Sequence, residues 1–205
     1  MALELVIAVV CGYLLGSIPF GLIISKRAAG SDLREFGSGK TGFTNSLRVL
    51  GLKRSLPVFA GDLLKGSAAA LLPLLYTDEP WARALGGLAA VVGHVWPVFA
   101  GFRGGRGVLT GAGVLLALSP IASVIAFMIA GLVILVTKYV SLASITGCVL
   151  ASVLSCAFAA NGNLAWPCAI VVTLGAVLVV VLHHDNIGRL LAGTERKVGQ
   201  RVVTP

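Results

Sequence analysis

Glycines alternate with cationic and hydroxyl side chains in residues 37–48, whose sequence is GSGKTGFTNSLR. Glycines allow successive backbone N–H groups to turn toward one anion. Side chains in the same segment add donors and positive charge, so we predict a phosphate-binding loop here. The residues expected to bind are Gly37, Ser38, Gly39, Lys40, Gly42, Thr44, Asn45 and Arg48. The alternative is a flexible basic loop that contacts anionic lipid headgroups.

The fragment GSGKT within this segment is also part of the nucleotide-binding P-loop pattern. That pattern requires a further glycine five residues before Gly39, where this chain has Arg34. Residues 30–36 are also not a buried strand. The pattern therefore disfavours a nucleotide P-loop and leaves only the general ability to bind an anion.

A second segment joins a histidine to a glycine and arginine cluster. Residues 93–99 read GHVWPVF and residues 102–107 read FRGGRG. A histidine inside an apolar run indicates a functional site, so His94 is a candidate, although it can also simply bond to a neighbouring helix. Arg103 and Arg106 flank Gly104 and Gly105 just before a predicted helix start, an arrangement that suits an anion.

The third segment, HHDNIGRL at residues 183–190, is followed by Glu195. His183 and Asn186 are three residues apart and share one face if the last helix continues. The alternative is a juxtamembrane anchor whose arginines contact lipid headgroups. Asp62 and Lys65 are likewise three apart within an apolar run. We expect them to pair in the bundle interior, either as a structural pair or as part of the site.

The elements that position these residues are predicted from composition. The chain has 205 residues, of which 57% are hydrophobic and 12% charged, with a mean hydropathy of +0.97. A soluble domain carries about 25% charged residues, so a water-soluble globular protein is excluded. The net charge of +8 is explained by basic loops rather than by nucleic acid. The four cysteines lie in apolar runs and predict neither a disulfide framework nor a zinc site.

Apolar runs of suitable length predict an all-α, polytopic integral membrane protein with seven transmembrane helices in one domain covering residues 1–205. The stretch 108–136 is divided in two at Ser119-Pro120 because proline removes a backbone donor. The predicted helices span residues 5–24, 56–76, 81–100, 108–118, 120–136, 140–160 and 164–182.

The distribution of basic residues predicts the orientation of these helices. Fourteen of the 16 Lys and Arg residues fall in the segments that one face of the membrane would share, and Arg83 and Lys65 are the exceptions. Basic loops stay in the cytoplasm, so the N-terminus is expected outside and the C-terminus inside. All three candidate segments then lie at the cytoplasmic face.

Two chemical patterns are missing from the sequence. The acyltransferase pattern H-x-x-x-x-D fails because Phe99 stands five residues after His94. There is also no run of carboxylates for a divalent metal, which disfavours a metal-dependent phosphotransferase. Three anion-binding segments on one face suggest substrates that carry phosphate.

With these motifs quoted, the chain resembles the bacterial integral-membrane acyl-phosphate:glycerol-3-phosphate acyltransferases. Their motifs have the forms G-S-G-N-x-G-A-T-N-x-x-R, G-H-x-x-P-x-F-x-x-F-K-G-G-K-G-V-A-T and H-R-x-N-I-x-R-L-x-x-G-x-E. Order, spacing and helix layout agree over nearly the whole chain. The positions that depart from the pattern are Lys40, Thr41, Phe43, Arg103, Arg106, Leu109 and His184.

The resemblance implies transfer of a fatty acyl group from acyl phosphate to the 1-hydroxyl of glycerol 3-phosphate in the bacterial cytoplasmic membrane. No cofactor, metal or nucleic acid is expected, and the partners are the two substrates and the bilayer. The implied catalytic residues are Ser38, His94, Arg106, His183 and Asn186. Those implied to bind substrate are Gly37, Gly39, Lys40, Gly42, Thr44, Asn45, Arg48, Arg103, Gly104, Gly105 and Glu195.

Two alternatives remain open at the level of sequence. The hydroxyl proton can go to His94, to His183 or to the phosphate of the donor. A transporter or channel for a phosphorylated metabolite would use intramembrane Asp62, Lys65 and His94 to line a pathway. The lack of an inverted repeat and the gathering of motifs on one face favour the enzyme.

Overall fold

The computed structural model describes residues 1–200, which contain ten α-helices, three short 3-10 helices and no strand. The all-α prediction is confirmed. The α-helices are α1 (Ala2–Gly16), α2 (Phe20–Ala29), α3 (Phe43–Leu50), α4 (Leu52–Leu71), α5 (Pro80–Val95), α6 (Val108–Leu118), α7 (Pro120–Thr137), α8 (Val140–Ala160), α9 (Trp166–Val181) and α10 (His184–Leu191). The 3-10 helices span Leu33–Glu35, Leu72–Leu75 and Val98–Ala100.

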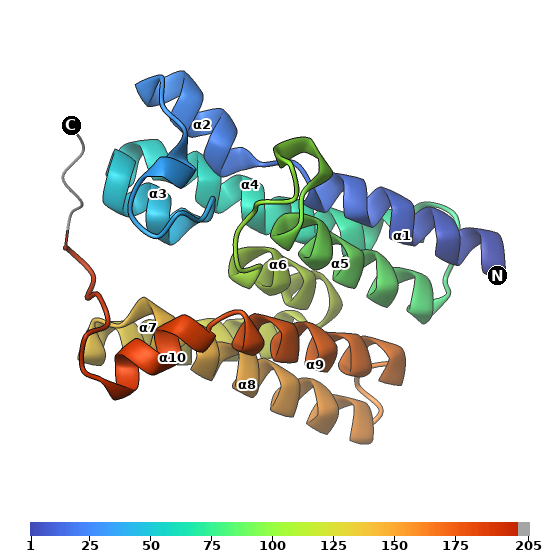
Figure 1. The fold of residues 1–205 in the computed structure, drawn as a ribbon. Helices are drawn as coiled ribbons and strands as arrows, with labels where there is room; N and C mark the ends of the chain where they lie inside the picture. The colour runs from blue at the N-terminus through green and yellow to red at the C-terminus, as the bar shows by residue number, and fades with distance from the viewer. Residues whose placement is uncertain (201–205) are drawn as a thin grey trace.

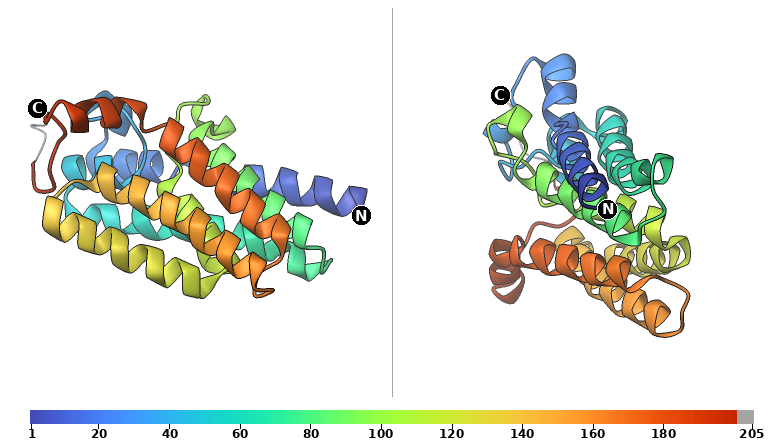
Figure 2. Two further views of the ribbon diagram at one scale, coloured as in Figure 1. Left: turned by 90° about the horizontal axis from the view of Figure 1, so that it is seen from below. Right: turned by 90° about the vertical axis from the view of Figure 1, so that its right-hand side faces the viewer.

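The helices form two layers with α6 between them. Figure 1 shows α1 to α5 on one side and α7 to α10 on the other, and the end-on view in Figure 2 shows the same separation. Helix α6 contacts α4 and α5 in the first layer and α7 and α9 in the second. The short helices α2, α3 and α10 lie at the end of the molecule opposite the N-terminus (Figures 1 and 2).

Small residues allow the helices of the first layer to pack closely. A Cβ atom added to Gly12 or Gly16 of α1 would collide with the backbone of α5 at Gly86 or Ala90. Gly66 of α4 meets the backbone of α6 in the same way. Contacts between small residues are how membrane helices associate without a hydrophobic driving force. These contacts fix α4 and α5, which carry Asp62 and His94.

The lengths of the helices support a protein that crosses the membrane several times. Five segments are long and apolar enough to cross, and a sixth is obtained if α9 and α10, which are bent by 56°, count as one span. The five are Ala2–Ala29, Leu52–Leu75, Pro80–Ala100, Pro120–Thr137 and Val140–Ala160. Helix α6 has 11 residues, or about 16 Å, roughly half the thickness of the hydrocarbon core.

Several helix boundaries differ from the predicted ones for identifiable reasons. The predicted helix 5–24 is broken because Pro19, which has no N–H group, follows the end of α1 and precedes α2. The helix predicted to end at residue 100 ends at Val95, just before Pro97. The helix predicted from residue 56 begins earlier, at Leu52, and its last turn becomes a 3-10 helix that contains Pro73.

Candidate active site

The three segments selected from the sequence converge on one cavity of about 540 Å³. The predicted site residues on its wall are Ser38, Lys40, Gly42, Thr44, Asn45, Arg48, His94, Arg106, His183, Asn186 and Glu195. A second cavity of about 400 Å³ is lined by Gly39, Arg103, Gly104 and Gly105, together with Lys40 and Arg106. Lys40 and Arg106 therefore contribute to both cavities. Gly37 lines neither of them and serves the geometry of the loop.

Asn45 organises the first segment through its side-chain amide. Its Oδ1 atom accepts a hydrogen bond of 2.9 Å from the backbone N–H of Ser38. Its Nδ2 atom donates to the carbonyl oxygens of Leu33, Phe36 and Lys40 at 3.1, 3.0 and 2.9 Å. The side chain is buried. Asn45 was predicted to donate to a ligand, but here its donors hold the loop in place.

Glycine at position 37 is required by the same arrangement. Gly37 has a φ of +63°, in the left-handed region that favours glycine. A Cβ atom there would also collide with Oδ1 of Asn45. The loop thus turns sharply around the Asn45 amide, and this turn places Ser38 and Lys40 on the cavity wall.

Arg34 joins the first segment to the second. Its Nη1 atom donates to the carbonyl oxygen of Ala100 at 2.8 Å, and its Nη2 atom pairs with Asp32 Oδ2 at 2.7 Å. The hydrogen bonds from Arg34 hold the pKa of the Asp32 carboxyl below its ordinary value, despite partial burial. Arg34 was not among the residues predicted for the site. In the sequence, only its spacing of two residues from Asp32 could have indicated that the two side chains pair.

The glycine pair of the second segment folds back onto the end of α5. The N–H groups of Gly104 and Gly105 donate to the carbonyl oxygens of Val95 and His94, each at 3.1 Å. A Cβ atom on Gly104 would collide with the His94 carbonyl oxygen, and one on Gly105 would collide with the His94 ring at Nε2. The pair was predicted to let a ligand approach closely, and the structure shows that it also lets the loop approach His94.

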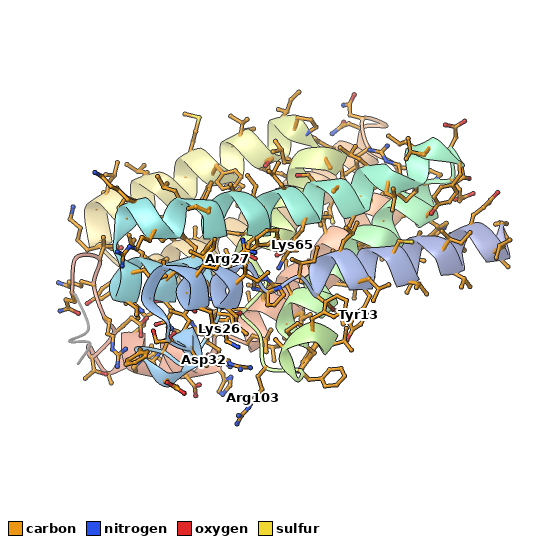
Figure 3. The ribbon with its side chains drawn as sticks, turned by 90° about the horizontal axis from the view of Figure 1, so that it is seen from above. Tyr13, Lys26, Arg27, Asp32, Lys65 and Arg103 are labelled. Atoms are coloured by element: carbon orange, nitrogen blue, oxygen red, sulfur yellow. The ribbon has the colours of Figure 1, made fainter. Side chains whose placement is uncertain are left out.

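His94 belongs to a buried cluster with Asp62 and Lys65 of α4. Asp62 Oδ1 lies 2.8 Å from Lys65 Nζ and 3.4 Å from His94 Nδ1. Lys65 Nζ also donates to the carbonyl oxygen of Ile18 at 2.9 Å. Asp62 and His94 line the first cavity, whereas Lys65 is not on its wall and lies among the helices (Figure 3). The predicted pair is therefore present and adjoins the site.

Arg106 connects the second segment to the third. Its Nε atom donates to the carbonyl oxygen of Leu182 at 3.2 Å. Next to it, the Nδ1 atom of His183 lies 2.7 Å from the carbonyl oxygen of Val179. A carbonyl oxygen only accepts, so Nδ1 carries the proton and Nε2 is left as an acceptor. Burial lowers the pKa of His183, and nearby Arg106 lowers it further, so the ring is neutral at neutral pH.

Glu195 fixes the donors of the third segment. Its Oε1 atom accepts from Asn186 Nδ2 and its Oε2 atom from Arg189 Nε, both at 2.7 Å. The Oδ1 atom of Asn186 is buried, and among residues 1–200 it has no hydrogen-bond partner. Asn186 was predicted to donate to a ligand. With its amide nitrogen bonded to Glu195, the group of Asn186 left without a partner among the described residues is an acceptor rather than a donor.

Positive charge accumulates around the first cavity. Burial lowers the pKa of Arg48, and the charge of Arg196 lowers it further. Burial also lowers the pKa of Arg106, with Arg189 as the next contribution. Cations held this close in a partly buried site favour the binding of an anion.

The remainder of the wall is apolar and comes mainly from α6 to α9. It includes Leu115, Ala126, Ala130, Ala151, Val172 and Ala176. The sequence alone does not reveal these residues, because an apolar side chain in a membrane helix looks the same whether it faces lipid, a neighbouring helix or a cavity. One continuous cavity thus combines cationic and hydrogen-bonding groups with an apolar interior.

Comparisons with known proteins identify the family of this chain. The sequence profile described as glycerol-3-phosphate acyltransferase matches residues 6–193. The chain belongs to the glycerol-3-phosphate acyltransferase family. Within this acyltransferase family, it is 42% identical to glycerol-3-phosphate acyltransferase 3 of Dehalococcoides mccartyi, with 97% of both chains covered. It is 42% identical to glycerol-3-phosphate acyltransferase of Shouchella clausii, with 98% of this chain and 99% of that one covered.

Solved structures of the same acyltransferase family show the same fold. The chain resembles the crystal structure of PlsY (YgiH), an integral membrane glycerol 3-phosphate acyltransferase, in its glycerol 3-phosphate form. The TM-score is 0.87 at 39% identity, covering 95% of this chain and 96% of that one. The family predicted from the motifs and the membrane character predicted from composition are confirmed. The roles of individual site residues stay predictions.

Proposed function

We propose that this enzyme transfers an acyl group from acyl phosphate to the 1-hydroxyl of glycerol 3-phosphate, giving lysophosphatidic acid and inorganic phosphate. The observation that carries the proposal is the single cavity with both a cationic wall and an apolar interior. Two phosphate-bearing substrates need the first, and a fatty acyl chain needs the second. The names of the relatives supply the acceptor, and the chemistry of the site supports the donor.

The donor argument rests on how little activation the reaction needs. An acyl phosphate is a mixed anhydride with a good leaving group, so positioning and charge stabilisation are the main tasks of the enzyme. The hydroxyl oxygen bonds to the acyl carbon, the bond from that carbon to the phosphate oxygen breaks, and the proton lost by the hydroxyl ends on the released phosphate. The reaction is balanced without a cofactor, and we expect no metal to be required.

The residues take roles that match their contacts. Arg48, Arg106 and Lys40 hold the two phosphates and the charge that develops on the leaving group. Asn186 Oδ1 accepts a hydrogen bond from a glycerol hydroxyl. His94 and His183 orient bound hydroxyl groups through Nε2, and Ser38 donates to a phosphate or acyl oxygen. The remaining predicted residues, Gly37, Gly39, Gly42, Thr44, Asn45, Arg103, Gly104, Gly105 and Glu195, shape the loops or complete the anion sites.

We further propose seven crossings of a bacterial cytoplasmic membrane, with the N-terminus outside and the site at the cytoplasmic face. Helix α6 is the short crossing. Its far end is supported by Arg83 of α5, whose Nη2 donates to the carbonyl oxygen of Ala117 at 3.2 Å. The other end begins at Gly107, beside Arg106 and the cavity. The relatives are bacterial proteins, which supports the compartment.

The test is an assay of purified protein in detergent with acyl phosphate and glycerol 3-phosphate, followed by mass spectrometry. Lysophosphatidic acid should form, and a chelator should leave the rate unchanged. Detergent removes the two compartments that transport needs, so product formation also separates an enzyme from a transporter. Equal or faster turnover with acyl-coenzyme A would contradict the proposed donor.

A further inference from the structure

The cluster of Asp62, Lys65 and His94 has a geometry that goes beyond a buried ion pair. The side chains of Asp62, Lys65 and His94 are 2%, 3% and 5% exposed, so water cannot replace their mutual contacts. One carboxylate oxygen, Oδ1, serves both the ammonium and the imidazole. An ion pair alone requires only the contact between Asp62 and Lys65. The third contact, from Oδ1 to His94 Nδ1, needs a separate explanation.

Lys65 is held in place from the other side. Its Nζ atom donates to the carbonyl oxygen of Ile18 in the break between α1 and α2 and lies 5.7 Å from the centre of the Phe20 ring. A lysine at this depth needs several such partners, because a charged group inside a membrane protein is costly without them. The ammonium in turn pairs with the Asp62 carboxylate and fixes its direction. This makes Asp62 an acceptor only.

An acceptor opposite Nδ1 determines the tautomer of His94. The nitrogen that faces Asp62 carries a ring proton, and in the neutral ring this arrangement leaves the lone pair on Nε2. Nε2 lies at the Gly105 side of the ring, where even a Cβ atom would collide with it. The ring also lines the first cavity. His94 thus lies on the wall that Arg106 shares, with its Nε2 beside the glycine pair that precedes Arg106.

His183 offers a useful contrast. Its Nδ1 atom bonds to the carbonyl oxygen of Val179 in its own helix turn, which is a neutral partner. The partner of His94 is a carboxylate from another helix, and that carboxylate is anchored through Lys65 to the break between α1 and α2. The orientation of His94 is thus set by tertiary contacts. Residues that do not contact the ligand commonly orient a functional side chain in this way.

We propose that Asp62 is a positioning residue, which fixes the ring and tautomer of His94 so that Nε2 accepts a hydrogen bond from the substrate hydroxyl that is acylated. Lys65 holds the Asp62 carboxylate in the orientation that its contact with His94 requires. The inference rests on the proposed function, because it names the group that His94 orients. Asp62 lies on the wall of the same cavity, and the role assigned to it is exercised through His94.

The test compares variants that separate positioning from charge balance. Asp62→Asn alone leaves the Lys65 ammonium buried without its partner and can fail to fold. The double variant Asp62→Asn/Lys65→Met removes both charges together, and buried pairs are often replaced in this way without loss of stability. The matched control is Ser67→Ala, also on α4, which removes a hydrogen bond of 2.8 Å to the Gly113 carbonyl oxygen away from His94.

Positioning predicts that the double variant folds and loses about 10- to 100-fold in kcat with little change in KM for either substrate. The Ser67→Ala variant should retain the wild-type rate. If Asp62 merely neutralises Lys65, the charge-free double variant will have the wild-type kcat, and the proposal is overturned.

Nitrogen-15 NMR of histidine-labelled protein supplies a readout that does not depend on activity. The wild type should show His94 with its proton on Nδ1, and the double variant should show a mixture of tautomers, with the signal assigned by its absence in His94→Gln. Wild-type His94 protonated on Nε2 would overturn the inference even if lysophosphatidic acid forms. Absence of product in the wild type would instead refute the proposed function and leave the tautomer result standing.

Discussion

Arg103 and Arg106 flank the same two glycines but have different surroundings. Arg103 is exposed and projects from the edge of the molecule (Figure 3), whereas Arg106 is half-buried, donates to the Leu182 carbonyl oxygen and lines both cavities. A charge held inside a cavity acts with less screening than one in water. The two arginines are therefore expected to differ in their contribution to the rate.

We predict that Arg106→Ala lowers kcat by about 10²- to 10³-fold, the effect typical of losing one preorganised donor in an active site. Arg103→Ala, the matched control, should mainly raise KM. Arg106→Lys should recover only part of the rate, since an ammonium cannot reproduce the planar fork of donors. Steady-state kinetics in detergent measure all three. Equal losses for both alanine variants would contradict the assignment.

Lys40 adds a positive charge where the resembled motif has Asn. It is exposed and lies on the walls of both cavities. A charge that contacts bound phosphate equally before and during the reaction lowers KM without raising kcat. Lys40→Asn should thus raise KM for one phosphorylated substrate, weaken its dependence on salt and leave kcat unchanged. Unchanged KM values across a salt titration would show that Lys40 acts only as surface charge.

At this scale the sequence predicted which residues meet but not how each is used. Ser38, His94, Arg106 and Asn186 share one cavity, as expected. The amide of Asn45 has the same chemistry whether it binds a phosphate or three backbone carbonyl groups, so the pattern alone did not distinguish these uses. Only the folded loop shows that its donors are occupied.

The side chain of Glu195 links α10 to the residues that follow it. Burial alone would raise the pKa of Glu195, but the hydrogen bonds from Asn186 and Arg189 hold it below its ordinary value of 4.5. A carboxyl group with a lowered pKa in the folded state adds stability above its unfolded pKa. This contribution is lost as the pH falls through the folded pKa.

We therefore predict that the unfolding temperature of the wild type in detergent exceeds that of Glu195→Gln at pH 7, and that the difference shrinks below about pH 4.5. The control is Glu35→Gln, which removes an exposed carboxylate at the end of the 3-10 helix Leu33–Glu35. Circular dichroism at a series of pH values measures the unfolding temperatures. A difference that is constant from pH 7 to pH 4 would rule out this linkage.

Element boundaries followed the apolar runs except where proline or a polar contact intervened. The run 5–24 has no charge to mark its break at Ile18-Pro19, and the contact that supports the break comes from Lys65, 47 residues away. Similarly, α9 and α10 are separate helices because the chain bends beside His183, near the carbonyl oxygen that binds Arg106. Such long-range partners are not visible in a local pattern.

The molecule is asymmetric along its length. Helices α2, α3 and α10 lie at one end, and the N-terminus lies at the other (Figures 1 and 2). Of the 16 Lys and Arg residues in the chain, 14 belong to segments assigned to the first end. The sequence predicts that these segments share one membrane face, because Lys and Arg accumulate in the loops of a single face whatever the details of packing. The length of α6 was the weaker signal, since 11 residues do not by themselves span a bilayer.

Labelling of single cysteines with an impermeant reagent tests the predicted orientation directly. The four native cysteines lie within helices and would be replaced first, giving a background without thiols. Single cysteines at exposed Asp78 or Asn161 should then react with an impermeant thiol reagent added to intact cells. Cysteines at exposed Glu35 or Asp185 should react only after permeabilisation, because their basic neighbours keep these segments in the cytoplasm. Reaction of Glu35→Cys in intact cells would place the cavity at the outer face, where a cytoplasmic acyl phosphate could not reach it.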